Sequence, residues 1–328
     1  MKRILVPLSL LLVAAVACNK SETIVEEPAV EIGFKSMATK AAADDIVAGT
    51  VLPSKDWKIF VTASAKYADA SVATQALFTN VPFATDETAT PLTAGAVFKA
   101  NPAQYYPLGS RTVDFIAYAA KTIDTPVAPT FAASPLGASD MMTFSGWDTY
   151  AQQQDLLYAN LNGCTTQPGA QALTFKHAQA QIVIQAAKGA TSGDIKITKV
   201  ELLGLQTTGD FVVDNTKQTL EVSWNGLDTG ADKQITNLFV SPATSVELTT
   251  TMAQIGDALL VPQQAAKNIK IYYKIGTDDR EWDYTYNNTR SAWMMGNKYI
   301  YQFTMTANEI TFTETVTDWL GTTITPAL

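Results

Sequence analysis

Short runs in which apolar and polar residues alternate recur along this chain, and this period of two constrains the fold more than any other feature. Clear examples are the runs at 57–61, 113–118, 269–275, 282–286 and 299–305. Apolar side chains at every second position line one face of a half-buried β-strand. Gly, Pro, Asn and Asp separate the runs, as turns do, and sustained helical periodicity is scarce. The chain is therefore predicted to be all-β, with strands spaced as in β-sandwiches.

The length of 328 residues suggests about two domains. A turn-like stretch, Thr165-Thr166-Gln167-Pro168-Gly169, predicts a boundary near residue 167. The alternation changes phase near the one histidine, His177, because Leu173 and Phe175 share one parity and Ala178 and Ala180 the other. A phase change predicts a bulge or bend. His177 is therefore interpreted as a structural residue and not as a ligand.

The composition argues against several classes of function. The net charge of −8 is unlike that of proteins that bind the nucleic-acid backbone. One histidine and two cysteines are too few for a Cys/His zinc site or a disulfide framework. No glycine-rich phosphate loop precedes a helix. We therefore predict neither catalytic residues nor a cofactor or metal.

The first 17 residues are predicted to be a signal peptide. Lys2 and Arg3 precede an apolar run that is shorter than the ~20 residues of a membrane-spanning helix. The segment Ala15-Val16-Ala17-Cys18 resembles a bacterial lipobox, which implies cleavage before Cys18 and acylation of its thiol and new amino group. Such lipid chains would hold the exported precursor on the outer membrane. The alternative is an ordinary signal peptide followed by a chance cysteine, and Cys164 is interpreted as a bystander.

Residues 18–40 are predicted to comprise a polar tether and one short strand. Val30, Ile32 and Phe34 alternate with polar or small residues, which is typical of a half-buried strand. The stretch that follows, from Ala38 to Asp45, is small and polar and predicts an exposed loop.

Several segments in a fixed order carry a family resemblance. They are Tyr105-Tyr106-Pro107 with the strand 113–118, Asp155-Leu156-Leu157-Tyr158-Ala159, residues 173–180, Ala258-Leu259-Leu260-Val261-Pro262-Gln263, Gly296-Asn297-Lys298-Tyr299-Ile300-Tyr301, and Val316-Thr317-Asp318-Trp319. Together with the leader they resemble the fimbrillins, pilus subunits of Bacteroidales. The resemblance implies two transthyretin-like β-sandwich domains in tandem, at residues 41–167 and 168–328.

The resemblance also implies assembly by strand exchange between neighbouring pilus subunits. Val30, Ile32 and Phe34 would form a placeholder strand, which a trypsin-like protease releases. The best match to the cleavage site is Lys40 before Ala41, although the family usually has Arg there, and Lys35 is the second choice. The donor segment would be C-terminal, and its candidate residues are Ile310, Phe312, Val316, Leu320 and Ile324. The stretch at 310–316 also fits an ordinary core strand, and the tail 320–328 is short for a full donor.

Two other functions remain open at this stage. A glycoside hydrolase needs two carboxylates about 5–9 Å apart, and Asp278, Asp279, Glu281 and Asp283 are candidates, although Asp278-Asp279-Arg280 resembles a hairpin loop. A surface lipoprotein could instead bind glycans through some of its six tryptophans. We predict a non-enzymatic pilus subunit of the cell surface that passes through the periplasm and supports adhesion or biofilm formation. It would be a shaft, anchor or tip subunit, with an unknown receptor and no nucleic-acid partner.

Overall fold

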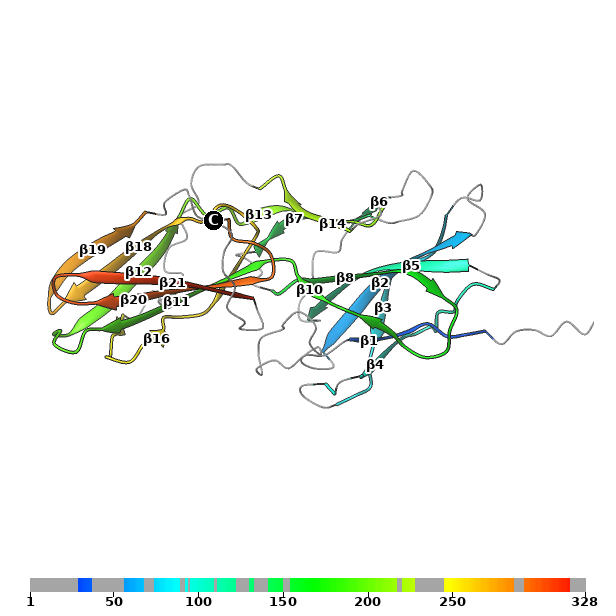
Figure 1. The fold of residues 1–328 in the computed structure, drawn as a ribbon, viewed down its shortest axis with the longest axis horizontal. Helices are drawn as coiled ribbons and strands as arrows, with labels where there is room; N and C mark the ends of the chain where they lie inside the picture. The colour runs from blue at the N-terminus through cyan, green and yellow to red at the C-terminus, as the bar shows by residue number, and fades with distance from the viewer. Residues whose placement is uncertain are drawn as a thin grey trace, which may run out of the picture.

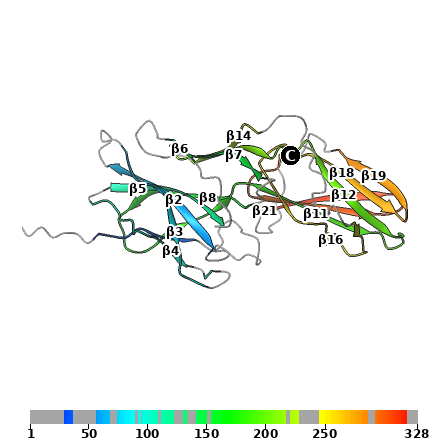
Figure 2. The same ribbon diagram turned by 180° about the vertical axis from the view of Figure 1, so that it is seen from behind.

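The structure is a computed structural model that describes residues 29–36, 56–67, 74–88, 92–93, 95–108, 111–121, 130–132, 141–149, 154–216, 220–227, 245–285 and 292–318. All of the elements with described bounds are β-strands, so the prediction of an all-β sandwich fold is confirmed. The molecule is elongated, with the earlier strands at one end and the later strands at the other (Figure 1). The view from behind shows the same arrangement (Figure 2).

The first half of the molecule is built on an eight-stranded sheet in the order β10-β8-β5-β2-β3-β4-β1-β9. Its strands are β1 (Gly33–Ser36), β2 (Trp57–Tyr67), β3 (Gln75–Ala84), β4 (Val97–Ala100), β5 (Arg111–Lys121), β8 (Leu157–Thr165), β9 (Gln171–Leu173) and β10 (Lys176–His177). One face of this sheet encloses a core to which most of these strands contribute. In β5, Val113, Phe115 and Ala117 face this core, as the alternation predicts.

The other face of this sheet is covered by a four-stranded sheet in the order β14-β13-β7-β6. Its strands are β6 (Thr130–Ala132), β7 (Met141–Asp148), β13 (Thr208–Asp214) and β14 (Glu221–Asn225). Ile116 and Tyr118 of β5 point into this second core, where Phe144 lies edge-on to Tyr118 with ring centres 5.0 Å apart. Because β13 pairs with β7, strands on both sides of residue 167 share a sheet. A domain boundary at that residue therefore stays a prediction.

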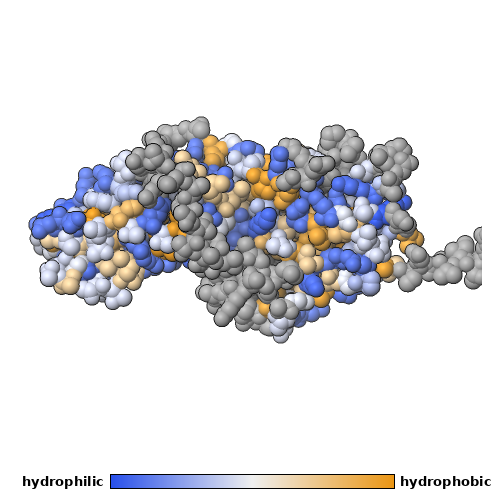
Figure 3. Space-filling model, viewed as in Figure 1, coloured by the Kyte–Doolittle hydropathy of each residue, from blue (hydrophilic) through white to orange (hydrophobic). Residues whose placement is uncertain are grey.

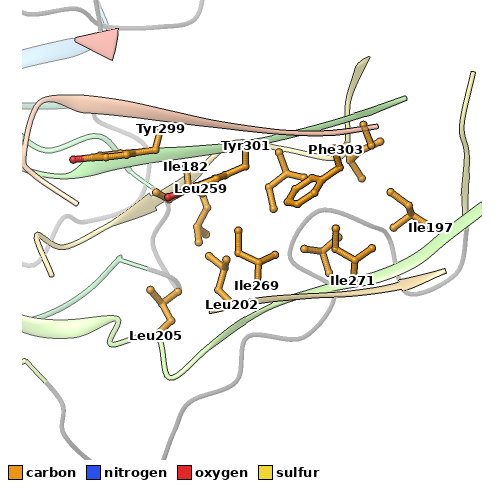
Figure 4. Close-up of a cluster of buried hydrophobic side chains, with 14 of the residues drawn as sticks. Ile182, Ile197, Leu202, Leu205, Leu259, Ile269, Ile271, Tyr299, Tyr301 and Phe303 are labelled. Atoms are coloured by element: carbon orange, nitrogen blue, oxygen red, sulfur yellow. The ribbon is translucent and has the colours of Figure 1, made fainter. Parts of the chain in front are cut away.

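The second half is a sandwich of two sheets, ordered β16-β11-β20-β21 and β15-β12-β18-β19, with β17 paired to β11. Its strands are β11 (Ala180–Lys188), β12 (Ile195–Leu203), β15 (Val246–Glu247), β16 (Ala253–Gln254), β17 (Leu259–Val261), β18 (Asn268–Ile275), β19 (Asp278–Tyr284), β20 (Asn297–Met305) and β21 (Ile310–Asp318). Figure 4 shows Tyr301 and Phe303 of β20 facing the layer that holds Ile269 and Ile271. Alternation in β18 and β20 therefore reflects one buried and one solvent-facing side.

The phase change at His177 marks the passage between the two halves. His177 ends β10 in the eight-stranded sheet, and Ala180 begins β11 in the second sandwich. His177 is buried, and its Nδ1 lies 2.8 Å from Asp155 Oδ1. The nearby Gln179 side chain accepts a hydrogen bond from Leu156 N and donates one to Gln154 O. The histidine thus has the structural role expected of it, at a bend between sheets.

Candidate strand-exchange site

β1 lies between β4 and β9 in the eight-stranded sheet. Figure 1 shows β1 alongside β4. It runs antiparallel to β4, with Phe34 opposite Phe98, and parallel to β9, with Phe34 beside Gln171. Ahead of the strand, Ile32 N donates to Gln104 O at 2.7 Å, and Val30 O accepts from Tyr106 N at 2.9 Å. We call the position that residues 29–36 occupy the β1 slot. The main chain of this short segment is therefore hydrogen-bonded along its length to segments distant in sequence.

The inner face of β1 fills the core of the first half. Ile32 and Phe34 are both 0% exposed, and Val30 packs partly against the same cluster. The Phe34 ring lies edge-on to Phe83 at 5.0 Å and to Phe115 at 5.1 Å between ring centres. We call the position of this ring, among Phe83, Phe98 and Phe115, the Phe34 site. Edge-on aromatic pairs add about 0.5–1.5 kcal/mol to the free energy of burial, so the Phe34 site favours an aromatic side chain.

The outer face of the β1 slot includes Glu31, Gly33 and Lys35. Lys99 Nζ of β4 lies 2.6 Å from Glu31 Oε2, and the Lys99 side chain is 59% exposed. A Cβ added at Gly33 would come no closer than 3.5 Å to another atom, Phe98 O. A hollow of about 440 Å³ lies here, lined by parts of β1, β4 and the turn at 168–170. The slot is therefore tight on its inner face and roomy on its outer face.

Two ionisable groups lie close to the slot. Burial, with a contribution from Cys164, raises the pKa of Tyr106 to about 12, although the nearby Gln171 side chain opposes the shift. Burial and the charge of Asp114 raise the pKa of the Cys164 thiol to about 11. Both groups are therefore neutral at physiological pH. A buried, protonated thiol is unreactive, which fits the prediction that Cys164 is a bystander.

β21, which carries three of the predicted donor residues, lies at the edge of its sheet among the described strands. It pairs antiparallel with β20 over nine positions without a register shift. Phe312 lies 4.0 Å from Tyr284 and 5.2 Å from Phe303 between ring centres, and Val316 is buried. Ile310 also packs against this core. The first stretch of the predicted donor is thus a strand of its own sandwich.

The remaining predicted processing and donor residues lie outside the described part of the chain. These are Cys18, Lys40, Ala41, Leu320 and Ile324. Lys35, the second choice for cleavage, lies within β1 and pairs with Val97 and Ala172. A protease needs an extended and accessible segment, so Lys35 is poorly placed while β1 is paired.

The residues that form the walls of the slot were missed by sequence reasoning. Phe83, Phe98 and Lys99 lie in strands that local alternation does not link to residues 30–34. The Tyr105-Tyr106-Pro107 segment was noticed only for its resemblance, yet Tyr106 binds the backbone of Val30. The one available signal was the opposite charge of Glu31 and Lys99, which is too common to identify a pair.

The structure places several of the residues on which the enzyme and glycan-binding alternatives depend. The candidate carboxylates lie in β19, which begins at Asp278, so the predicted hairpin loop at 278–280 was wrong. Asp279 pairs with Lys274, and Glu281 and Asp283 pair with Lys270. Among the described residues, no cluster of His, Cys, Asp and Glu is suited to holding a metal ion. The side chains of Trp57, Trp147 and Trp293 are buried.

Hydrophobic and hydrophilic residues are unevenly distributed over the surface. Hydrophobic residues gather over the first half and the middle of the visible face, whereas the far end of the second sandwich is mostly hydrophilic (Figure 3). No helix in the described part of the chain has the length and hydrophobicity of a membrane span.

Comparisons with known proteins agree with this architecture. In solved structures, a candidate cell adhesion protein of Bacteroides uniformis aligns with a TM-score of 0.52 at 18% identity, covering 89% of this chain and 97% of that one. A candidate cell adhesion protein of Bacteroides ovatus gives 0.51 at 18% identity, covering 89% and 98%. A fimbrial protein of Bacteroides vulgatus gives 0.50 at 16% identity, covering 88% and 99%. At such identities the likeness shows a shared fold.

Sequence comparison is more specific. No curated protein sequence matched this chain. The model of the fimbrillin-like family matches residues 39–319, which is most of the chain and includes every described strand except β1. The chain therefore belongs to the fimbrillin-like family.

Proposed function

We propose that this protein is a non-enzymatic structural subunit of a cell-surface pilus and that it joins its neighbour by strand exchange at the β1 slot. Family membership supports the role as a pilus subunit. The observation that carries strand exchange is the position of β1, a short N-terminal strand that fills a gap between β4 and β9. A strand from another subunit could take its place and reproduce its backbone hydrogen bonds.

The physical reason for exchange is that an empty β1 slot is unstable. Without β1, the inward edges of β4 and β9 lose their pairing partner, and Phe83, Phe98 and Phe115 lose the ring that covers them. Unpaired strand edges and exposed apolar surface both favour the addition of a new strand. The placeholder therefore protects the precursor, and its loss prepares the subunit for assembly.

Maturation would follow the order of segments along the chain. Acylation at Cys18 would hold the precursor on the outer membrane, and cleavage between Lys40 and Ala41 would free the segment that contains β1. The subunit would donate its C-terminal tail, residues 320–328, to the next subunit. β21 does not need to leave its own sandwich for this, because the tail follows it in the chain.

Treatment of the purified precursor with a trypsin-like protease tests the proposal. We expect a new N-terminus at Ala41 and release of the 29–36 segment. The product should then associate with subunits that present a donor strand, and electron microscopy would detect this association. The matched control is Lys40→Gln, which should keep β1 in place and block association. Retention of β1 after complete cleavage at Lys40 would contradict the exchange.

The donor role of the tail has its own test. A variant that ends at Trp319 should keep the unfolding transition of the intact protein but should no longer join an open neighbouring subunit. Assembly at an unchanged rate would exclude residues 320–328 as the donor.

A further inference from the structure

We propose that the strand which fills this protein's β1 slot in the pilus comes from a different subunit, whose donor strand carries an aromatic side chain at the Phe34 site and an acidic one beside Lys99. This inference rests on the proposed strand exchange and adds the chemistry of the partner. A second copy of this chain is then a poor donor, and the protein joins a mixed pilus at this junction.

The first requirement comes from the inner face of the slot. Val30, Ile32 and Phe34 lie at alternate positions, and the last two are completely buried. The Phe34 ring is surrounded by other rings at 5.0 and 5.1 Å between centres. A smaller side chain at this point leaves a cavity among rigid groups, because packed interiors relax only partially.

The tail of this chain does not meet the first requirement. Leu320, Thr322 and Ile324 share one parity. Their alignment with Val30, Ile32 and Phe34 places an isoleucine at the Phe34 site and a threonine at the Ile32 position. A shift by two residues places Thr322 at the Phe34 site instead. Trp319 is the one aromatic residue between 319 and 328. Its parity is opposite to that of Leu320, Thr322 and Ile324. A register that places the Trp319 ring at the Phe34 site puts Thr317 at the Ile32 position and Gly321 at the next inward position.

The second and weaker requirement comes from the outer face, because an exposed ion pair contributes little binding energy. Glu31 gives Lys99 a carboxylate partner at 2.6 Å, on the side of the slot that borders the hollow. Residues 319–328 contain no acidic side chain, and the alignment above places Gly321 where Glu31 stands. The tail of a second copy would therefore leave Lys99 without the carboxylate that the placeholder supplies.

Another segment of the chain has the required pattern but is held in place. Glu309-Ile310-Thr311-Phe312 matches Glu31-Ile32-Gly33-Phe34 at three of four positions. In the folded subunit, however, Phe312 packs against Tyr284 and Phe303, and β21 is paired with β20 along its whole length. Donation of this segment would strip the second sandwich of a strand. A different subunit with a free strand of this pattern meets both requirements.

Peptide binding to the protease-processed protein, after separation from the released segment, tests the inference. The probes are a peptide of residues 29–36, a peptide of residues 319–328, and the latter with Thr322→Ile and Ile324→Phe. The matched control carries Thr323→Phe, which adds a ring on the opposite parity. Fluorescence anisotropy should give the double variant a Kd roughly tenfold or more below that of the natural tail, as expected for one filled cavity. The control should show no gain.

The outcomes separate the two proposals. Equal Kd values for the natural tail and the 29–36 peptide would overturn the inference and leave strand exchange standing. An equal decrease in Kd for the Thr323→Phe peptide and for the double variant would also overturn the inference. The tighter binding would then reflect added hydrophobicity at any position of the peptide. Failure of the 29–36 peptide to bind would reject exchange at this slot, and the inference with it.

Discussion

The segments that lead into β1 and β21 have similar sequences but different positions in the fold. Both present Ile and Phe two residues apart after a Glu, at Glu31-Ile32-Gly33-Phe34 and Glu309-Ile310-Thr311-Phe312. In both, the Phe lies opposite another Phe, Phe98 for β1 and Phe303 for β21. β1 is four residues long and lies between two strands, whereas β21 has nine residues and one described neighbour.

This difference indicates that the sequence separation between a strand and its neighbours determines how readily another strand can replace it. β21 continues directly from β20 through a short turn at 306–309, so it forms with its neighbour as a local hairpin. The neighbours of β1 are distant in sequence, and its pairing must wait until both are in place. Non-local pairing carries a larger entropic cost than a hairpin. A short, non-local strand is therefore the better candidate for exchange.

Deletion of each strand should give the largest effect. A protein that ends at Glu309 loses the cover over Tyr301 and Phe303, at about 1.5–3 kcal/mol for each buried apolar side chain removed, and we expect its second sandwich to unfold. A protein that begins at Ala41 should keep that sandwich, lose stability only in the first half, and regain it when the 29–36 peptide is added. Near-ultraviolet circular dichroism and thermal unfolding would measure both. Unfolding of the second sandwich in both proteins would break the comparison.

Single alanine substitutions should give the next largest effect. Phe34→Ala should lower the free energy of unfolding of the precursor by about 3–5 kcal/mol, since the ring is completely buried. Phe312→Ala should cost about 1–3 kcal/mol, because its side chain is only partly buried. Lys35→Ala, on the outer face of β1, should change the stability by less than about 0.5 kcal/mol. Urea denaturation measures all three.

The processed protein provides the control for these substitutions. The Phe34→Ala effect should vanish after β1 has been released, whereas the Phe312→Ala effect should persist. Persistence of the Phe34→Ala effect in the processed protein would mean that the segment remains bound.

The smallest expected effect is a shift in the ionisation of Tyr106. While β1 is seated, the pKa of Tyr106 is raised to about 12 by burial. Release of Val30, its backbone partner, should expose the phenol and bring its pKa towards about 10. The open state then binds fewer protons between these values, so raising the pH through this window favours release of β1. Ultraviolet titration should show one more tyrosine that ionises near pH 10 in the processed protein than in the precursor. The Tyr106→Phe variant is the control, because it lacks this group.

Sequence reasoning located strands well because parity depends on local order alone. The alternation of Ile32 and Phe34, or of Tyr299 and Tyr301, correctly predicted which side chains are buried. It could not reveal which strands meet, since the pairing of β1 with β4 and β9 depends on long-range contacts. For the same reason, the return of β13 and β14 to the first half was not foreseen. The candidate site was therefore half predicted: the short strand around Ile32 and Phe34 was located, and its surroundings were not.

The mixed pairing of β1 has a consequence for the direction in which a pilus is built. A replacement strand that reproduces both sets of hydrogen bonds must run antiparallel to β4 and parallel to β9, as β1 does. Only one of the two chain directions meets that condition. Under the proposed strand exchange, every junction of this kind would have the same head-to-tail sense. The fibre would then be polar along its axis, and its two ends would present different chemistry to the cell and to the outside.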